Sequence, residues 1–180
     1  MDIKIREPIL ENLDERGIPV DFASIMNYFN RGLQNKNHPC YRFMPRQTPI
    51  SLDEIRNLWI PSLKTNLNYL AEQNGKVIGA ATVLFDPNSN EYEHRSLRAP
   101  GTLSLTTSPD VDYKTTAIPL IERVLITLKR RNQKATLTTP VEFNEDIEIV
   151  SALGFSPIER PHEPYKDIGL SGRAAVFQFP

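Results

Sequence analysis

The chain has 180 residues, 39% of them hydrophobic and 24% charged, which is the composition of a soluble globular domain. Its net charge of −1 gives no electrostatic basis for binding nucleic acid or an anionic membrane. The one cysteine, Cys40, excludes an internal disulfide and favours a reducing compartment. We find no signal peptide and no run of about 18 apolar residues, so we expect a cytoplasmic protein without a membrane segment.

The first third of the chain predicts a short strand and two helices. Residues 3–5, "IKI", alternate as in a strand. A helix is expected over 19–33, with Asp21 as its N-cap. A second helix begins at Ser51, which has the capping-box spacing to Glu54. Its buried face would comprise Leu52, Ile55, Leu58 and Trp59.

A hairpin and a central strand come next. Two apolar runs are joined by Asn74-Gly75, the strongest short turn signal. After a polar excursion over 86–101, residues 102–108, "TLSLTTS", alternate and are rich in Thr and Leu. We therefore expect a meander of three strands.

The last third alternates helices and strands. We expect a helix over 117–131, whose apolar face is formed by Ile118, Ile121, Val124, Leu125 and Leu128. A strand over 134–139 and a helix capped by Asn144 and ended by Gly154 follow, then strands over 155–159 and 174–179.

Helices between strands imply a crossover with some parallel pairing. The fold class is thus α/β (α+β), one domain over 1–180 with a mixed, mostly antiparallel sheet of about six or seven strands and about four helices.

Four segments together resemble the GNAT superfamily of acyl-CoA N-acyltransferases. They are the hairpin "NGKVIGAATV", the strand "TLSLTTS", the loop and helix "DYKTTAIPLIERVL", and the helix "NEDIEIVSALGF". The resemblance covers most of the chain and implies a sheet that is split at its centre. It also implies transfer of an acetyl group from acetyl-CoA to a primary amine.

The resemblance also implies residues that contact the cofactor. Leu105, Thr106 and Thr107 would line the pantetheine arm, and Asn144 is a weaker match near the cofactor. The segment expected to hold the pyrophosphate comprises Lys114, Thr115, Thr116, Ala117, Ile118 and Pro119.

This segment departs from the glycine-rich family loop. Ala117 replaces a glycine, Lys114 keeps a cation, and the two threonine hydroxyls would add donors. We expect Pro119 to lie in the first helical turn, where it costs the fold little but removes one phosphate donor. That loss would weaken binding about ten- to hundredfold.

No catalytic residue carries over from the family. The strand 102–108 lacks the usual Glu, and the position of the usual Tyr corresponds to Val150. Glu91, Glu93 and His94 could supply a base near neutral pH, although a solvated hairpin tip also explains them. His162, Glu163 and Tyr165 could reach the acceptor pocket, but a structural loop is the favoured interpretation, and for His38 with Cys40 a packed thiol is favoured. The three His and one Cys show no metal-ligand spacing, so no metal site is expected.

The segment "CYRFM" corresponds to the acceptor region of the family. Tyr41, Arg42 and Phe43 are therefore candidate contacts for a small-molecule or peptide amine, and packing of the aromatic rings is the alternative. The rival function is an inactive GNAT-fold domain that senses a ligand or binds a protein. A transferase with an aminoacyl donor also remains open, and a homodimer is consistent with the family.

Overall fold

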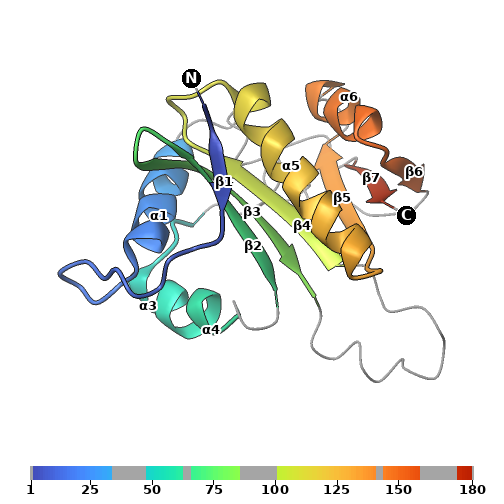
Figure 1. Ribbon diagram of the computed structural model, residues 1–180. Coiled ribbons are helices and arrows are strands. Elements are labelled where there is room, and N and C mark those ends of the chain that lie inside the picture. The colour runs from blue at the N-terminus through green and yellow to red at the C-terminus, as the bar shows by residue number, and fades with distance from the viewer. Residues whose placement is uncertain are drawn as a thin grey trace, which may run out of the picture.

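The computed structural model describes residues 2–33, 48–62, 66–85, 101–140, 144–158 and 174–179. In this part of the chain, seven strands form one sheet in the order β1-β2-β3-β4-β5-β7-β6 (Figure 1). Only the β4–β5 pairing is parallel, so the mixed, mostly antiparallel sheet is confirmed. The strands are β1 Lys4–Arg6, β2 Leu67–Gln73, β3 Lys76–Leu84, β4 Gly101–Thr107, β5 Ala135–Pro140, β6 Ser156–Ile158 and β7 Ala174–Phe179.

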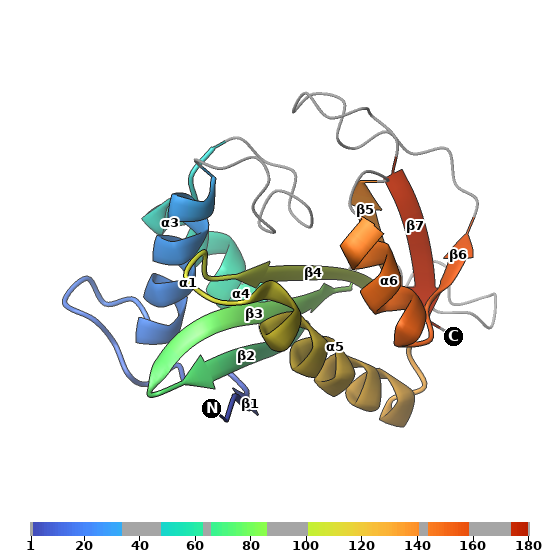
Figure 2. The same ribbon diagram turned by 90° about the horizontal axis from the view of Figure 1, so that it is seen from above.

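Helices cover both faces of this sheet. The helix α5 crosses one face, and α1 lies on the opposite face (Figure 2). Three short pieces, α3, the π-helical η1 and α4, follow one another directly and lie near α1. The bounds are α1 Val20–Gly32, α3 Leu52–Glu54, η1 Ile55–Trp59, α4 Ile60–Ser62, α5 Tyr113–Arg130 and α6 Asn144–Ala152. No helix in these described ranges is long and apolar enough to cross a membrane.

Two apolar cores lie on the two faces of the sheet. The core under α5 and α6 contains Leu120 and Leu137, both fully buried. The core under α1 contains Phe29 and Leu70. Because side chains alternate along a strand, Leu70 joins one core and the next residue, Ala71, joins the other.

The hairpin expected at Asn74-Gly75 is confirmed. Both residues have positive φ, 52° and 73°, as a two-residue turn of type I′ requires. Gln73 pairs with Lys76, but an irregularity between Ala71 and Glu72 shifts the register of the rest of the hairpin. This shift decides which side chains of β2 and β3 face each core.

The N-cap expected at Asp21 is wrong. The residue before α1 is Pro19, which makes no side-chain cap, and Asp21 lies in the first turn of the helix. Its carboxylate instead accepts two hydrogen bonds from Arg6, at 2.7 and 2.8 Å, and one from the N–H of Ile9 at 2.7 Å. Burial raises the pKa of the Asp21 carboxyl, but these bonds outweigh it and leave the pKa below its usual value. Asp21 therefore ties α1 to β1, since Arg6 also bonds Glu72 on β2.

The second expected helix begins as predicted, and three of its four expected face residues pack against the core under α1. Ser51 accepts the N–H of Glu54 at 3.1 Å, so this side-chain cap is confirmed. Ile55 is fully buried, whereas Leu58 is 62% exposed and does not join the buried face. The cause is the π-helical winding of 55–59, in which the N–H of Ile60 bonds the carbonyl of Ile55. The wider turn rotates residue 58 away from the core.

The end of α6 follows the sequence pattern. Gly154 has a φ of 89°, and its N–H donates to the carbonyl of Ser151 at 3.1 Å. The N–H of Phe155 reaches back to Val150 at 3.0 Å, which completes a Schellman motif. Asn144 is the first residue of the helix.

Candidate functional site

The sheet is split between its two central strands. Parallel pairing between β4 and β5 is limited to Gly101 with Ala135 and Thr102 with Thr136. From Leu103 onwards the two strands, both fully described, share no ladder pair. Figure 2 shows β4 and β5 diverging from this junction. The split expected from the resemblance is therefore present.

The backbone of β4 beyond the junction faces the side of the sheet where β5 has parted. The N–H of Gly101 donates to Lys134 on the β5 side at 2.9 Å, and the N–H of Ser108 donates to Ile78 on the β3 side at 2.7 Å. Because these directions alternate along an antiparallel strand, Leu103 and Leu105 direct their N–H and C=O groups toward β5. Their side chains are buried in the core under α5.

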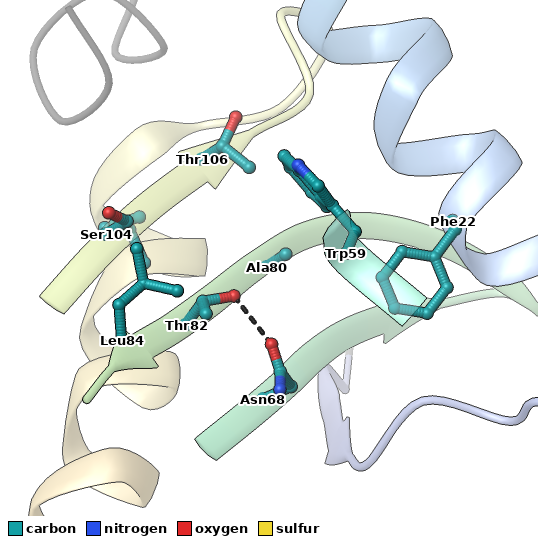
Figure 3. Close-up of a pocket in the computed structure, with 9 residues that line it drawn as sticks. Phe22, Trp59, Asn68, Ala80, Thr82, Leu84, Ser104 and Thr106 are labelled. Carbon is teal, nitrogen blue, oxygen red and sulfur yellow. Dashed lines mark hydrogen bonds between the residues drawn. The ribbon is translucent and has the colours of Figure 1, made fainter. Parts of the chain in front are cut away.

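A pocket of about 100 Å³ lies beside the same strand, on the face of the sheet that α1 covers (Figure 3). Its walls come from α1, η1 and the central strands β2, β3 and β4. The residues that line it are Phe22, Trp59, Asn68, Ala80, Thr82, Leu84, Ser104, Leu105 and Thr106. None of these nine residues carries an ionisable side chain, so the described lining contains neither a general base nor a charge.

A row of polar side chains crosses this pocket. Asn68 pairs with Thr82 in the register of β2 and β3, and Thr82 pairs with Ser104 in the register of β3 and β4. The Thr82 hydroxyl donates to Asn68 Oδ1 at 2.9 Å (Figure 3). Asn68 Nδ2 is buried and has no hydrogen-bond partner among the described residues.

The first turn of α5 lies at the end of β4, where the pyrophosphate was expected. Asp112 is the N-cap, and its carboxylate accepts the N–H of Thr115 at 2.8 Å and also the Thr115 hydroxyl. The Thr116 hydroxyl donates to the carbonyl of Asp112 at 3.1 Å. Both hydroxyls that the sequence offered as phosphate donors are thus engaged within the turn.

Charges of both signs surround this turn, namely Asp110, Asp112, Arg31 and Lys114. Hydrogen bonds from the hydroxyl and the N–H of Thr115 hold the pKa of the Asp112 carboxyl below its usual value, so it is ionised at neutral pH. Asp110 precedes it and pairs with Arg31 of α1 at 2.9 Å. Lys114 is exposed.

Pro119 does not lie where the sequence placed it. The helix α5 begins at Tyr113, four residues before the expected start, so Pro119 is its seventh residue and lies in the second turn. The N–H that proline lacks would have bonded the carbonyl of Thr115, not a ligand at the helix start. Ala117 is fully buried and Ile118 is partly buried, both against the core under α5.

Gly79 on β3 lets the start of α5 approach the sheet. A Cβ atom at this position would lie 2.7 Å from Thr116 Cγ2 and 3.2 Å from the carbonyl oxygen of Thr106. Thr116 is 1% exposed, so its methyl group fills this space. The close approach positions the first turn of α5 beside the end of β4.

Several candidates from the sequence lie outside the described residues. They are Tyr41, Arg42 and Phe43 and the alternatives Glu91, Glu93, His94, His162, Glu163, Tyr165, His38 and Cys40. The side chain of Asn144 is likewise not described. Val150 is buried in the core under α5. In the described ranges, no group of three His, Cys, Asp or Glu side chains is arranged to hold a metal ion.

Sequence reasoning missed the pocket residues Trp59, Asn68, Thr82 and Ser104. The available signal was the polar side chains of 68, 82 and 104 at alternating positions within three apolar strands. That signal identifies one face only when the strand register is known.

No family model and no curated protein matches the sequence. Solved structures match its fold. An N-acetyltransferase from Staphylococcus aureus Mu50 has a TM-score of 0.73 and 15% identity, over 99% of this chain and 98% of that chain. A GNAT superfamily phosphinothricin acetyltransferase from Sinorhizobium meliloti in complex with acetyl-CoA has a TM-score of 0.74 and 18% identity, over 100% and 89%.

A spermidine N-acetyltransferase from Vibrio cholerae in complex with CoA and spermine has a TM-score of 0.68 and 18% identity, over 98% of this chain and 94% of that chain. The fold is thus that of the GNAT acyltransferases, which confirms the resemblance found in the sequence.

Proposed function

We propose that this protein is an N-acetyltransferase that transfers an acetyl group from acetyl-CoA to the primary amine of a small-molecule or peptide acceptor. One observation carries the proposal. One edge of the strand β4 borders the parting from β5, and the pocket lies over the face of the same strand at residues 104–106. A donor along the parting and an acceptor in the pocket would therefore meet at the same strand.

The residues fit the pantetheine part of acetyl-CoA better than its pyrophosphate. The backbone of β4 can pair with an extended amide-bearing arm, and Leu105, Thr106 and Thr107 are the residues proposed to line it. Lys114 and the first-turn N–H groups of α5 are the groups proposed to hold the pyrophosphate. Solved structures of the same fold that contain acetyl-CoA or CoA support this assignment.

The proposed acetyl transfer needs few catalytic side chains. Acetyl-CoA supplies an activated thioester, and the pocket would orient the amine in its neutral form beside β4. Because the described lining of the pocket contains no ionisable group, the proton of the amine would leave to water. No described residue is proposed as a general acid or base.

The alternative is a domain of the same fold that senses a ligand or binds a protein without turnover. The observation that favours it is the Asp112 carboxylate, which occupies the helix start and consumes the N–H of Thr115. Helix starts usually attract anions such as pyrophosphate, but the negative charge of Asp112 at this helix start would repel one.

Calorimetry with acetyl-CoA, followed by a turnover assay with a panel of primary amines, tests the proposal. Saturable binding with transfer to at least one amine is the expected result. Binding without transfer to any amine would favour the sensing domain, and no binding at all would favour the protein-interaction domain. The homodimer and the cytoplasmic location stay predictions, and sedimentation of the purified chain tests the first.

A further inference from the structure

We infer that the pocket beside β4 selects an acceptor whose side group is small, uncharged and largely apolar, and carries a neutral hydrogen-bonding group such as a carboxamide. This inference rests on the proposed function, because the pocket is taken as the acceptor side of the site. It names a class of substrate from the size, charge and polarity of the described lining.

The size and apolar surface of the pocket indicate one ring or a branched aliphatic group. Phe22 and Trp59 form an edge-to-face pair, with ring centroids 6.4 Å apart and an interplanar angle of 83°. The side chains of Ala80 and Leu84 complete the apolar lining. The volume is about 100 Å³, and an engineered cavity of about 150 Å³ in another protein holds benzene.

The absence of charge in the described lining argues against cationic acceptors. Asp21 is the sequence neighbour of Phe22, but its carboxylate is held by Arg6 and the N–H of Ile9. A buried ammonium group needs a partner of opposite charge, and none of the nine lining residues supplies one. Polyamines are consequently expected to be poor acceptors, unlike in the spermidine N-acetyltransferase of the same fold.

The polar row gives the pocket its hydrogen-bonding preference. Asn68 Oδ1 already accepts the Thr82 hydroxyl, so the amide has its Nδ2 donors left for another partner. The register places the Ser104 side chain next to Thr82 on the same face, where its hydroxyl can donate or accept. A carboxamide has both a carbonyl oxygen for Asn68 and an N–H for a hydroxyl, whereas a carboxylate would add an uncompensated charge.

Three amines that differ in one group test this preference. Phenylalaninamide carries a neutral carboxamide, phenylalanine carries a carboxylate in its place, and 2-phenylethylamine has neither. We expect kcat/KM for phenylalaninamide to exceed that of each of the others about tenfold or more, with spermidine the poorest acceptor. Equal values for phenylalaninamide and 2-phenylethylamine, or a preference for phenylalanine or spermidine, would overturn the inference.

Two variants locate the effect. Asn68→Leu should reduce the ratio of phenylalaninamide to 2-phenylethylamine to about one, and Ser104→Ala should reduce it in part. The matched control is Asn12→Leu, the same change at an exposed residue outside the pocket, which should leave the ratio unchanged. Thermal unfolding identifies a variant that fails to fold. An unchanged ratio in folded Asn68→Leu contradicts the inference, and Ser104→Ala decides the matter if Asn68→Leu does not fold.

Calorimetry without acetyl-CoA separates this inference from the proposed function. If no amine is acetylated but phenylalaninamide binds more tightly than 2-phenylethylamine in an Asn68-dependent manner, the function fails and the pocket preference stands. If amines are acetylated without regard to the carboxamide, the function stands and the pocket preference is wrong.

Discussion

The two regions at the end of β4 differ in how their hydrogen-bonding groups are used. The pocket has neutral walls, a buried Asn68 Nδ2 without a partner among the described residues, and aromatic side chains. At the start of α5 the N-cap Asp112 carries a negative charge, and the Thr115 and Thr116 hydroxyls are bonded to it. The pocket therefore has a hydrogen-bond donor left for a ligand, whereas several donors at the helix start already bond within the helix start.

This difference separates the features of a site that the fold determines from those that the side chains determine. The parting of β4 from β5 depends on strand direction and register, so it persists when the side chains change. Anion binding at a helix start depends on which N–H groups stay available and which charges lie nearby. A single Asp at the N-cap alters both without disturbing the helix.

The largest expected effect is at Asp21, whose buried carboxylate pairs with Arg6 and ties α1, on the pocket side, to β1. Asp21→Asn leaves Glu72 as the only described carboxylate that pairs with Arg6 and should lower the free energy of unfolding by about 3 kcal/mol, measured by urea denaturation near neutral pH. Because folding lowers the pKa of Asp21, its contribution is complete above the unfolded value of about 3.9 and is lost as the pH falls through the folded pKa. The difference between wild type and variant should therefore shrink in acid. A constant difference down to pH 2 would contradict this assignment.

The contact between β3 and the first turn of α5 is broken by filling the space at Gly79. Gly79→Ala places a methyl group against Thr116 and should cost about 2 kcal/mol in unfolding free energy. Thr116→Ser removes the methyl group that it meets, so the double variant should recover part of the loss. Additive losses in this double-mutant cycle would show that α5 does not approach β3 as closely as described.

Pro119→Ala distinguishes a stability effect from a ligand effect at the helix start. The substitution restores a helical N–H toward the carbonyl of Thr115 and should stabilise the protein by about 1–2 kcal/mol. Because residue 119 lies in the second turn, the affinity for acetyl-CoA should change less than about twofold. A large gain in affinity for acetyl-CoA would show that residue 119 contacts the phosphates, contrary to this prediction.

The smallest expected effect is at the N-cap itself. Asn caps helices as well as Asp does, so Asp112→Asn should leave the unfolding transition almost unchanged. The loss of one negative charge should raise the affinity for acetyl-CoA about three- to tenfold at low salt, with less gain at high salt. Glu122→Gln, on the exposed face of α5 away from its start, is the charge-matched control. Equal responses of the two variants would place Asp112 away from the phosphates.

Local patterns predicted those parts of the fold that local interactions determine. The Asn74-Gly75 turn and the Gly154 end of α6 each need a positive φ that few residues adopt, so their position was readable. Asp21 was not, because its partner Arg6 is remote in sequence and a first-turn aspartate resembles an N-cap. The π-helical winding that exposes Leu58 also has no local signal.

The candidate site was only partly predictable for related reasons. The irregularity between Ala71 and Glu72 sets Asn68 opposite Thr82, and counting back from the turn alone would have misaligned them by one residue. The start of α5 was predicted at Ala117, four residues too late, because Ala117 matches a glycine of the family's loop. The spacing from Asp112 to Thr115 was the better signal of an N-cap.

The narrow junction between β4 and β5 also bears on how the protein opens. Two ladder pairs join β1–β4 to β5–β7–β6, whereas six pairs join β5 to β7 within one half. Backbone amides in the two halves should therefore fall into two hydrogen-exchange classes, each with its own opening free energy. We expect the boundary between the two classes at Gly101 and Thr102, although the core under α5 and α6 is shared by both halves. A domain built in this way can loosen along its ligand-facing strand while the hairpin under α5 stays folded.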